Sequence, residues 1–170
     1  MTRTSAKARA VAAPVIRGLT VLNALYALGL AALLVWSFFI DGWPQRPLGF
    51  ETANAHPLLG HGLRAIIVVG LIGAAIVQSI LRRLLAIVDT VRVGDPFILD
   101  NARRLDVIAW SVAALEGLRL VVAAIAATVW EAGQIDAFSF APWLSVLLLF
   151  VLAGVFAHGA QMRADLEGTV

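Results

Sequence analysis

An acidic and a basic side chain stand close together inside a long apolar run, and such a pair could do chemistry within a membrane. Glu116 and Arg119 lie near the centre of the run Val107–Trp130. Because they are three residues apart, a helix would place them on one face, where they can pair. Each charge at the centre of a span costs about 2.5–3.5 kcal/mol on insertion scales, so isolated charges there are disfavoured. The pattern predicts either a structural ion pair or a sensing or proton-coupled site, with Asn23 and Gln78 as further polar partners.

Two histidines in a predicted loop are the next candidates for chemistry. His56 and His61 lie five residues apart within residues 41–62, in the company of Asp41 and Glu51. Such a pair could supply half of a zinc site, but no further set of ligands accompanies it in the sequence. We therefore expect ordinary loop histidines, with no metal and no other cofactor.

The motifs that would indicate an enzyme are missing from the sequence. The chain has no cysteine, which excludes disulfides, thiol catalysis and cysteine-ligated metals. Neither the phosphate-binding pattern GxxxxGK[ST] nor the nucleophile pattern GxSxG occurs. We predict no catalytic residues and expect a protein that is not an enzyme.

The composition indicates which kind of structure must position these side chains. Of the 170 residues, 61% are apolar and 14% are charged, and the mean hydropathy is +0.89. Soluble domains contain about 25% charged residues. A soluble domain of this size could not bury so much apolar surface, whereas a bilayer can cover it. The net charge of +2 does not favour direct nucleic-acid binding, and we predict one membrane domain over residues 1–170.

Four apolar runs divide the chain, each close to the roughly 20 residues that cross a hydrocarbon core. We predict an all-α fold, an antiparallel bundle of four transmembrane helices, with spans near 18–40, 63–81, 107–130 and 142–160. The basic segment Met1–Arg17 is expected to be a solvated tail that orients the first helix, or a lipid-binding arm. The first run is too long for a signal peptide and ends in aromatic residues, so we expect an uncleaved span.

Small residues recur at helical spacing in two of these runs. Gly70 and Ala74 are one helical turn apart in the second run, and Ala153, Gly154 and Ala157 form a similar group in the fourth. Small side chains allow helix backbones to approach closely in a membrane. We therefore expect both groups to be packing faces.

The distribution of basic residues predicts the orientation. With the N-terminus inside, the cytoplasmic segments would hold ten basic residues, and the outer loops only Arg46 and Arg64. Basic residues favour the cytoplasmic side, so we predict a multi-pass protein of the bacterial cytoplasmic (inner) membrane with both termini in the cytoplasm. Four tryptophans near the ends of the runs would then lie at the outer interface, namely Trp36, Trp43, Trp130 and Trp143.

The stretch between the second and third runs, Arg82–Leu105, carries most of the polar residues between the spans. Apolar residues recur on one helix face on both sides of its middle, so we expect both arms to extend the spans into a cytoplasmic helical hairpin. At the turn, Gly94 would end one helix, Asp95 would cap the next and Pro96 would be its first residue. We expect Phe97 to pack against the hairpin or the C-terminal tail.

Two motifs on this predicted cytoplasmic face resemble a known family. The first is Gly94–Phe97 followed by Asn101, Arg104 and Leu105, and the second comprises Arg163, Asp165, Leu166, Thr169 and Val170. In this order they resemble the bacterial domain-of-unknown-function family 2975, small four-helix integral membrane proteins, over roughly Leu63 to the end. Leu99 departs from the pattern, where a polar residue is commoner. Family members are often encoded beside a small helix-turn-helix regulator, so the resemblance implies such a regulator as a partner.

Two functions from different classes are compatible with these patterns. We favour a regulatory or interaction protein whose hairpin and tail dock a cytoplasmic partner, with the tail beside Arg103 and Arg104. The alternative is a small transporter or channel component that uses Glu116 and Arg119 in a polar path. A passive membrane-assembly factor and a homo-oligomer are also compatible. A co-transcribed repressor would favour docking, whereas a transport operon would favour the alternative.

Overall fold

The computed structural model describes residues 3–44, 58–93, 97–129 and 139–167, and within these ranges it contains helices and no strand. The four long helices are α1 (Arg3–Trp36), α3 (Leu59–Val93), α4 (Leu99–Val129) and α5 (Phe140–Glu167). Each contains a segment long and apolar enough to cross a membrane. The predicted all-α class with four candidate spans is confirmed.

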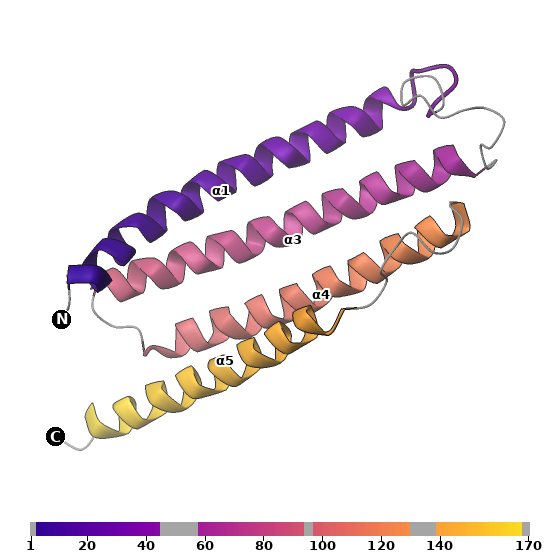
Figure 1. Cartoon of the computed structure of the whole chain (residues 1–170). Helices are drawn as coiled ribbons and strands as arrows, with labels where there is room; N and C mark the ends of the chain where they lie inside the picture. The colour runs from indigo at the N-terminus through magenta and orange to yellow at the C-terminus, as the bar shows by residue number, and fades with distance from the viewer. Residues whose placement is uncertain (1–2, 45–57, 94–96, 130–138, 168–170) are drawn as a thin grey trace.

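The helices lie side by side in chain order and form an open row (Figure 1). Contacts join α1 to α3, α3 to α4 and α4 to α5, while any contact between the outer helices α1 and α5 is marginal in the described part of the chain. The row differs from a closed four-helix bundle, in which the first and last helices would also pack together. A membrane protein does not require that closure, because lipid can cover the outer faces. Both termini lie at one end of the row, together with the end of α3 and the start of α4.

The helices are longer than the predicted spans. The basic N-terminal segment is helical from Arg3 onward and continues into the first span, so it belongs to α1 itself, and its expected solvation stays a prediction. Helix α1 contains Pro14 and changes direction near its N-terminal end (Figure 1), as expected where a proline removes a helical hydrogen bond. Helix α3 has 35 residues, and at about 1.5 Å per residue it exceeds the roughly 30 Å of a hydrocarbon core.

Two glycines of α3 lie where this helix packs against its neighbours α1 and α4. A Cβ placed on Gly70 would lie 3.0 Å from Cδ1 of Leu30 in α1, and one placed on Gly73 would lie 3.8 Å from Cδ2 of Leu115 in α4. Ala74 is buried beside them. The close-packing face predicted from Gly70 and Ala74 is therefore confirmed.

The fourth helix departs from the same prediction at one residue. Ala153 is buried, but a Cβ placed on Gly154 would meet nothing within 4 Å. Gly154 is exposed, so it leaves a hollow on α5 instead of admitting a neighbouring helix. The small-residue pattern could not distinguish these outcomes, because it does not specify which side chain fills the space.

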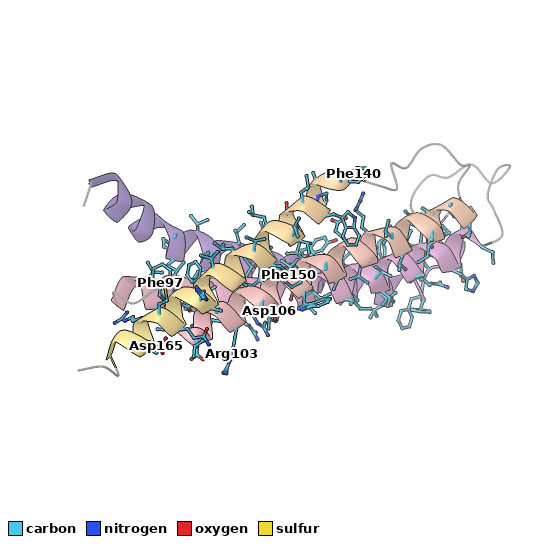
Figure 2. All side chains as sticks on the ribbon, turned by 90° about the horizontal axis from the view of Figure 1, so that it is seen from below. Phe97, Arg103, Asp106, Phe140, Phe150 and Asp165 are labelled. Carbon is cyan, nitrogen blue, oxygen red and sulfur yellow. The ribbon has the colours of Figure 1, made fainter. Side chains whose placement is uncertain are left out.

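Large apolar side chains are exposed on the outer helices. Leu22 in α1 is 63% exposed and Leu148 in α5 is 68% exposed. Figure 2 shows side chains projecting all along α5, from Phe140 past Phe150 to Asp165. Apolar surface on this scale is unfavourable in water and favourable in lipid, in agreement with the hydropathy of the four helices.

Candidate functional site

One end of the molecule holds most of the described charged side chains, and we name it the charged end. It comprises the end of α3, the start of α4 and the end of α5, beside both termini (Figure 1). Arg103 and Asp165 both project at this end in Figure 2. Its exposed charged residues are Arg82, Asp89, Asp100, Arg103, Asp106, Arg163 and Asp165. The described residues of the two motifs that suggested the family therefore lie at the same end of the fold.

Asn101 is fully buried at the charged end and joins α4 to α3. Its Nδ2 donates to Oγ1 of Thr90 at 2.7 Å, and that hydroxyl donates to the Ile87 carbonyl at 2.7 Å. Its Oδ1 accepts from Nη1 of Arg104 at 2.8 Å. A buried amide is costly unless it is hydrogen-bonded, so this network holds the start of α4 in one register against α3. The motif contained Asn101 and Arg104, and the structure places them in direct contact.

The first turn of α4 begins later than predicted. The helix begins at Leu99, and the Ile98 carbonyl accepts from the Asn101 amide at 3.0 Å. A residue whose carbonyl accepts the first helical bond occupies the N-cap position. The predicted start at Pro96 is therefore wrong. The remaining predicted turn residues, Gly94, Asp95 and Pro96, lie outside the described residues.

Phe97 precedes α4 and packs on α5. Its ring centroid lies 5.1 Å from that of Phe156, and a Cβ placed on Gly159 would lie 3.1 Å from its Cδ1. The partner of Phe97 is thus the fourth helix itself, not the predicted hairpin or the tail beyond it. This contact joins the segment that leads into α4 to the fourth helix.

Leu105 takes a core position at the same end. It is buried, one helical turn after Asn101, so the two motif residues share the inward face of α4. Ile108 continues that face and is also buried. The periodicity predicted one helix face for these three residues together with Phe97 and Ile98. The structure confirms it for Asn101, Leu105 and Ile108, whereas Phe97 and Ile98 precede the helix.

Helix α5 continues to Glu167 and includes part of the predicted C-terminal contact, namely Arg163, Asp165 and Leu166. Arg163 and Asp165 are exposed. Arg104 bonds to Asn101, and the predicted contact of the tail with Arg103 and Arg104 stays a prediction. The rest of the motif, Thr169 and Val170, lies outside the described residues, so a contact made by the end of the chain stays a prediction.

Glu116 and Arg119 form the predicted pair within α4. Nε of Arg119 donates to Oε2 of Glu116 at 2.9 Å, and the Glu116 side chain is 13% exposed against 36% for Arg119. The bond neutralises two charges near the middle of an apolar helix, where each would be costly alone. Such a pair lowers the cost of insertion whether or not it has a further function.

The two amides expected beside this pair bond to each other. Nδ2 of Asn23 donates to Oε1 of Gln78 at 2.9 Å and to the Ala74 carbonyl at 3.0 Å. This contact joins α1 to α3, whereas the bond between Glu116 and Arg119 runs along α4. The sequence identified all four residues, and a contact of either amide with Glu116 or Arg119 stays a prediction.

Arg64 makes a contact that the sequence analysis missed. Its Nη2 donates to the Ser37 carbonyl at 2.6 Å and its Nε to Ser37 Oγ at 3.1 Å. Its Cζ lies 4.5 Å from the Phe38 ring centroid, within cation–π range. A cation at a helix C-terminus is favourable, so Arg64 fastens the end of α1 to the start of α3. The available signal was a lone arginine at the start of the second apolar run.

The histidine pair gains no support as a metal site. His61 is exposed and belongs to the first turns of α3 rather than to a loop, while His56 lies outside the described residues. In the described ranges, no three residues capable of binding a metal come together.

The fold and its exposed apolar faces indicate a multi-pass helical membrane protein. The chain matches the family described as protein of unknown function (DUF2975) over residues 5–170, and it belongs to that family. The match confirms the family predicted from the two motifs and extends it from roughly Leu63 to nearly the whole chain. No curated protein and no solved structure matches the chain.

Proposed function

We propose that this chain is a non-catalytic regulatory or interaction protein of the bacterial inner membrane, with a docking surface for a cytoplasmic partner at its charged end. The observation that carries the proposal is the Asn101 network, which fixes α3 against α4 by a fully buried amide. Exposed Asp100, Arg103 and Asp106 lie on the same helix. A fixed scaffold bearing exposed charges favours specific recognition, because little ordering is required when a partner binds.

The proposal includes an antiparallel arrangement of the four spans, with both termini in the cytoplasm and α3 and α4 extending beyond the bilayer. It is supported by the grouping of basic side chains at the charged end, while Arg64 lies at the other end of α3. Basic residues favour the cytoplasmic side. Reporter fusions after Arg92 and after Gln134 test the orientation. A cytoplasmic signal after Arg92 and an external signal after Gln134 are expected, and the reverse result would contradict the proposal.

The partner we propose is a small helix-turn-helix regulator, which the chain would hold at the membrane without itself binding nucleic acid. The exposed charges of α4 alternate in sign, which fits a protein surface better than the uniformly negative backbone of DNA. The family resemblance supplies the class of regulator. A regulator encoded beside this gene is the first protein to test.

The docking experiment uses the full chain in nanodiscs and the purified neighbouring regulator. Reversing the charges at Asp100, Arg103 and Asp106 together should weaken binding at least tenfold and change its salt dependence. Asp41→Lys is the charge-reversal control, because Asp41 is exposed just after the end of α1, at the opposite end from the charged end. Equal binding by the triple variant and the control would place the partner elsewhere.

A second candidate, a small transporter or channel component, is supported by the placement of Glu116 and Arg119 within an apolar helix. Glu116→Gln, Arg119→Gln and the charge-neutral double variant separate it from a structural pair. A structural pair predicts that each single change destabilises the fold and that the double change partly restores stability. A functional site predicts stable single variants that lose ion or substrate flux in proteoliposomes. If both single variants are stable and fully active, neither account holds.

A further inference from the structure

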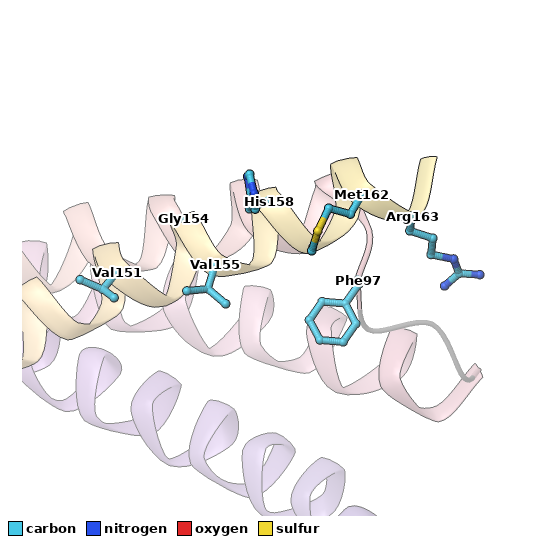
Figure 3. Close-up of a pocket in the computed structure, with 8 residues that line it drawn as sticks. Phe97, Val151, Gly154, Val155, His158, Met162 and Arg163 are labelled. Carbon is cyan, nitrogen blue, oxygen red and sulfur yellow. The ribbon is translucent and has the colours of Figure 1, made fainter. Parts of the chain in front are cut away.

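A groove of about 800 Å³ runs along α5 at the charged end. Figure 3 shows it beneath α5, with Val151 and Val155 toward one end and Phe97, Met162 and Arg163 toward the other. The lining is apolar apart from His158 and Arg163. It therefore combines a long apolar wall with positive charge at one end.

Two glycines shape this groove in different ways. Gly159 supports the Phe97 ring, whose Cδ1 would be 3.1 Å from an added Cβ. Gly154 faces open space, with nothing within 4 Å of an added Cβ. The aromatic ring thus forms one wall, and the missing side chain at Gly154 leaves the floor open.

The dimensions of the groove match one half of a bilayer. Val151 and Arg163 both line it, and the helix rises about 18 Å over the 12 steps from one to the other, at about 1.5 Å per step. One leaflet of a hydrocarbon core is about 15 Å deep. Arg163 also lies just beyond the apolar run predicted to end near residue 160, and a bilayer centred on that run would place its guanidinium near the lipid headgroups.

The charge of the groove selects a class of lipid. Arg163 provides a guanidinium at one end of the groove, and guanidinium groups bind phosphate oxygens well. A second hollow, lined by residues of α4 and α5, contains both Arg103 and Asp106. The opposite charges of that hollow largely offset each other, so it lacks the same attraction for an anion.

We propose that the α5 groove binds a phospholipid with an anionic headgroup. The headgroup phosphate contacts Arg163, and one acyl chain lies along Val155 and the open floor at Gly154. The bilayer supplies this ligand directly to a helix that spans it. Binding here is independent of the proposed docking function, because it does not require the exposed charges of α4.

The first test is lipid occupancy of the purified full chain in detergent, measured by native mass spectrometry. Phosphatidylglycerol and phosphatidylcholine with identical acyl chains are compared, and a clear preference for phosphatidylglycerol is expected. Equal occupancy by the two lipids would overturn the proposal.

Filling the groove tests its position. Gly154→Leu should remove the phosphatidylglycerol preference, because the new side chain occupies the open floor. Gly117→Leu is the matched control on α4, since a Cβ at Gly117 also meets nothing within 4 Å. If Gly154→Leu retains full occupancy, the groove is not the binding site. If it instead abolishes a dimer seen for the wild type, a second copy of the chain is the occupant and the lipid proposal fails.

Removing the charge tests the headgroup contact. Arg163→Gln should lower phosphatidylglycerol occupancy about fivefold, which corresponds to about 1 kcal/mol for one basic residue at a membrane surface. Arg103→Gln, at the same end but in the second hollow, should leave occupancy unchanged. An equal loss in the two variants would indicate general surface charge and would overturn the assignment to this groove.

Discussion

The two outer seams of the row, α1 with α3 and α4 with α5, are built in different ways. In the first, Leu30 fills the space above Gly70, and Asn23 bonds to Gln78. In the second, aromatic rings hold the helices, as in the T-shaped contact of Trp110 with Phe150 at 5.3 Å. The α1–α3 seam therefore combines a leucine packed on Gly70 with polar bonds, whereas Gly154 on α5 has no neighbour within 4 Å of an added Cβ.

The difference shows that one small-residue pattern can have two structural outcomes. A glycine increases helix contact only where a neighbouring side chain enters the space that it leaves. At Gly70 a leucine does so, and at Gly154 nothing does. The first glycine contributes to stability through packing, whereas the second creates a surface that a ligand can occupy.

The largest expected change in the free energy of unfolding comes from substituting these two glycines, Gly70 and Gly154. Gly70→Leu should destabilise the fold by about 3 kcal/mol, because an added Cβ already lies 3.0 Å from Leu30 and overpacking costs about 1–3 kcal/mol. Gly154→Leu should change stability by less than about 1 kcal/mol, since its side chain enters open space. Unfolding free energies in mixed micelles measure both changes. Equal losses would show that the seams do not differ.

The next largest change in stability is expected from the Arg64 contact, which joins the end of α1 to the start of α3. Arg64→Met should cost about 2 kcal/mol, because it removes two hydrogen bonds to Ser37 and hydrogen bonds to charged groups contribute about 1.5–3 kcal/mol. Arg82→Met serves as the control, because Arg82 is exposed at the charged end. Thermal melting of the two variants distinguishes them. A stable Arg64→Met variant would mean that small-residue packing alone holds this seam.

A smaller effect is expected from the aromatic contact of the α4–α5 seam. Phe97→Ala should cost about 1.5 kcal/mol, because aromatic pairs contribute about 0.5–1.5 kcal/mol beyond their buried area and the ring is partly exposed. Gly159→Ala should destabilise the wild type but not the Phe97→Ala variant, since the three atoms nearest to its Cβ would all belong to that ring. Additive losses in this double-mutant cycle would contradict the contact.

The smallest effect tests the amide contact between α1 and α3. Coupling between Asn23→Leu and Gln78→Leu should be about 0.6 kcal/mol, the average found for hydrogen bonds between membrane helices. The four variants of the cycle are compared by their unfolding free energies in micelles. Coupling near zero would show that Asn23 is satisfied by the Ala74 carbonyl alone.

Composition and run length were sufficient to predict four apolar helices, because the absence of water in a bilayer leaves few backbone structures that satisfy their own hydrogen bonds. The motif residues Asn101 and Arg104 could also be recognised from the sequence, and so could the ion pair between Glu116 and Arg119. Local spacing determines these features, since residues three apart on a helix necessarily share a face.

Contacts between helices depended on the tertiary structure. Spacing along one helix does not specify the rotation of its neighbour, so the sequence could not show that Asn23 meets Gln78 or that Arg64 reaches Ser37. For the same reason it could not distinguish the filled space at Gly70 from the open one at Gly154. Local periodicity determines the faces of each helix, whereas the packing of the row decides which faces meet and which remain open to lipid.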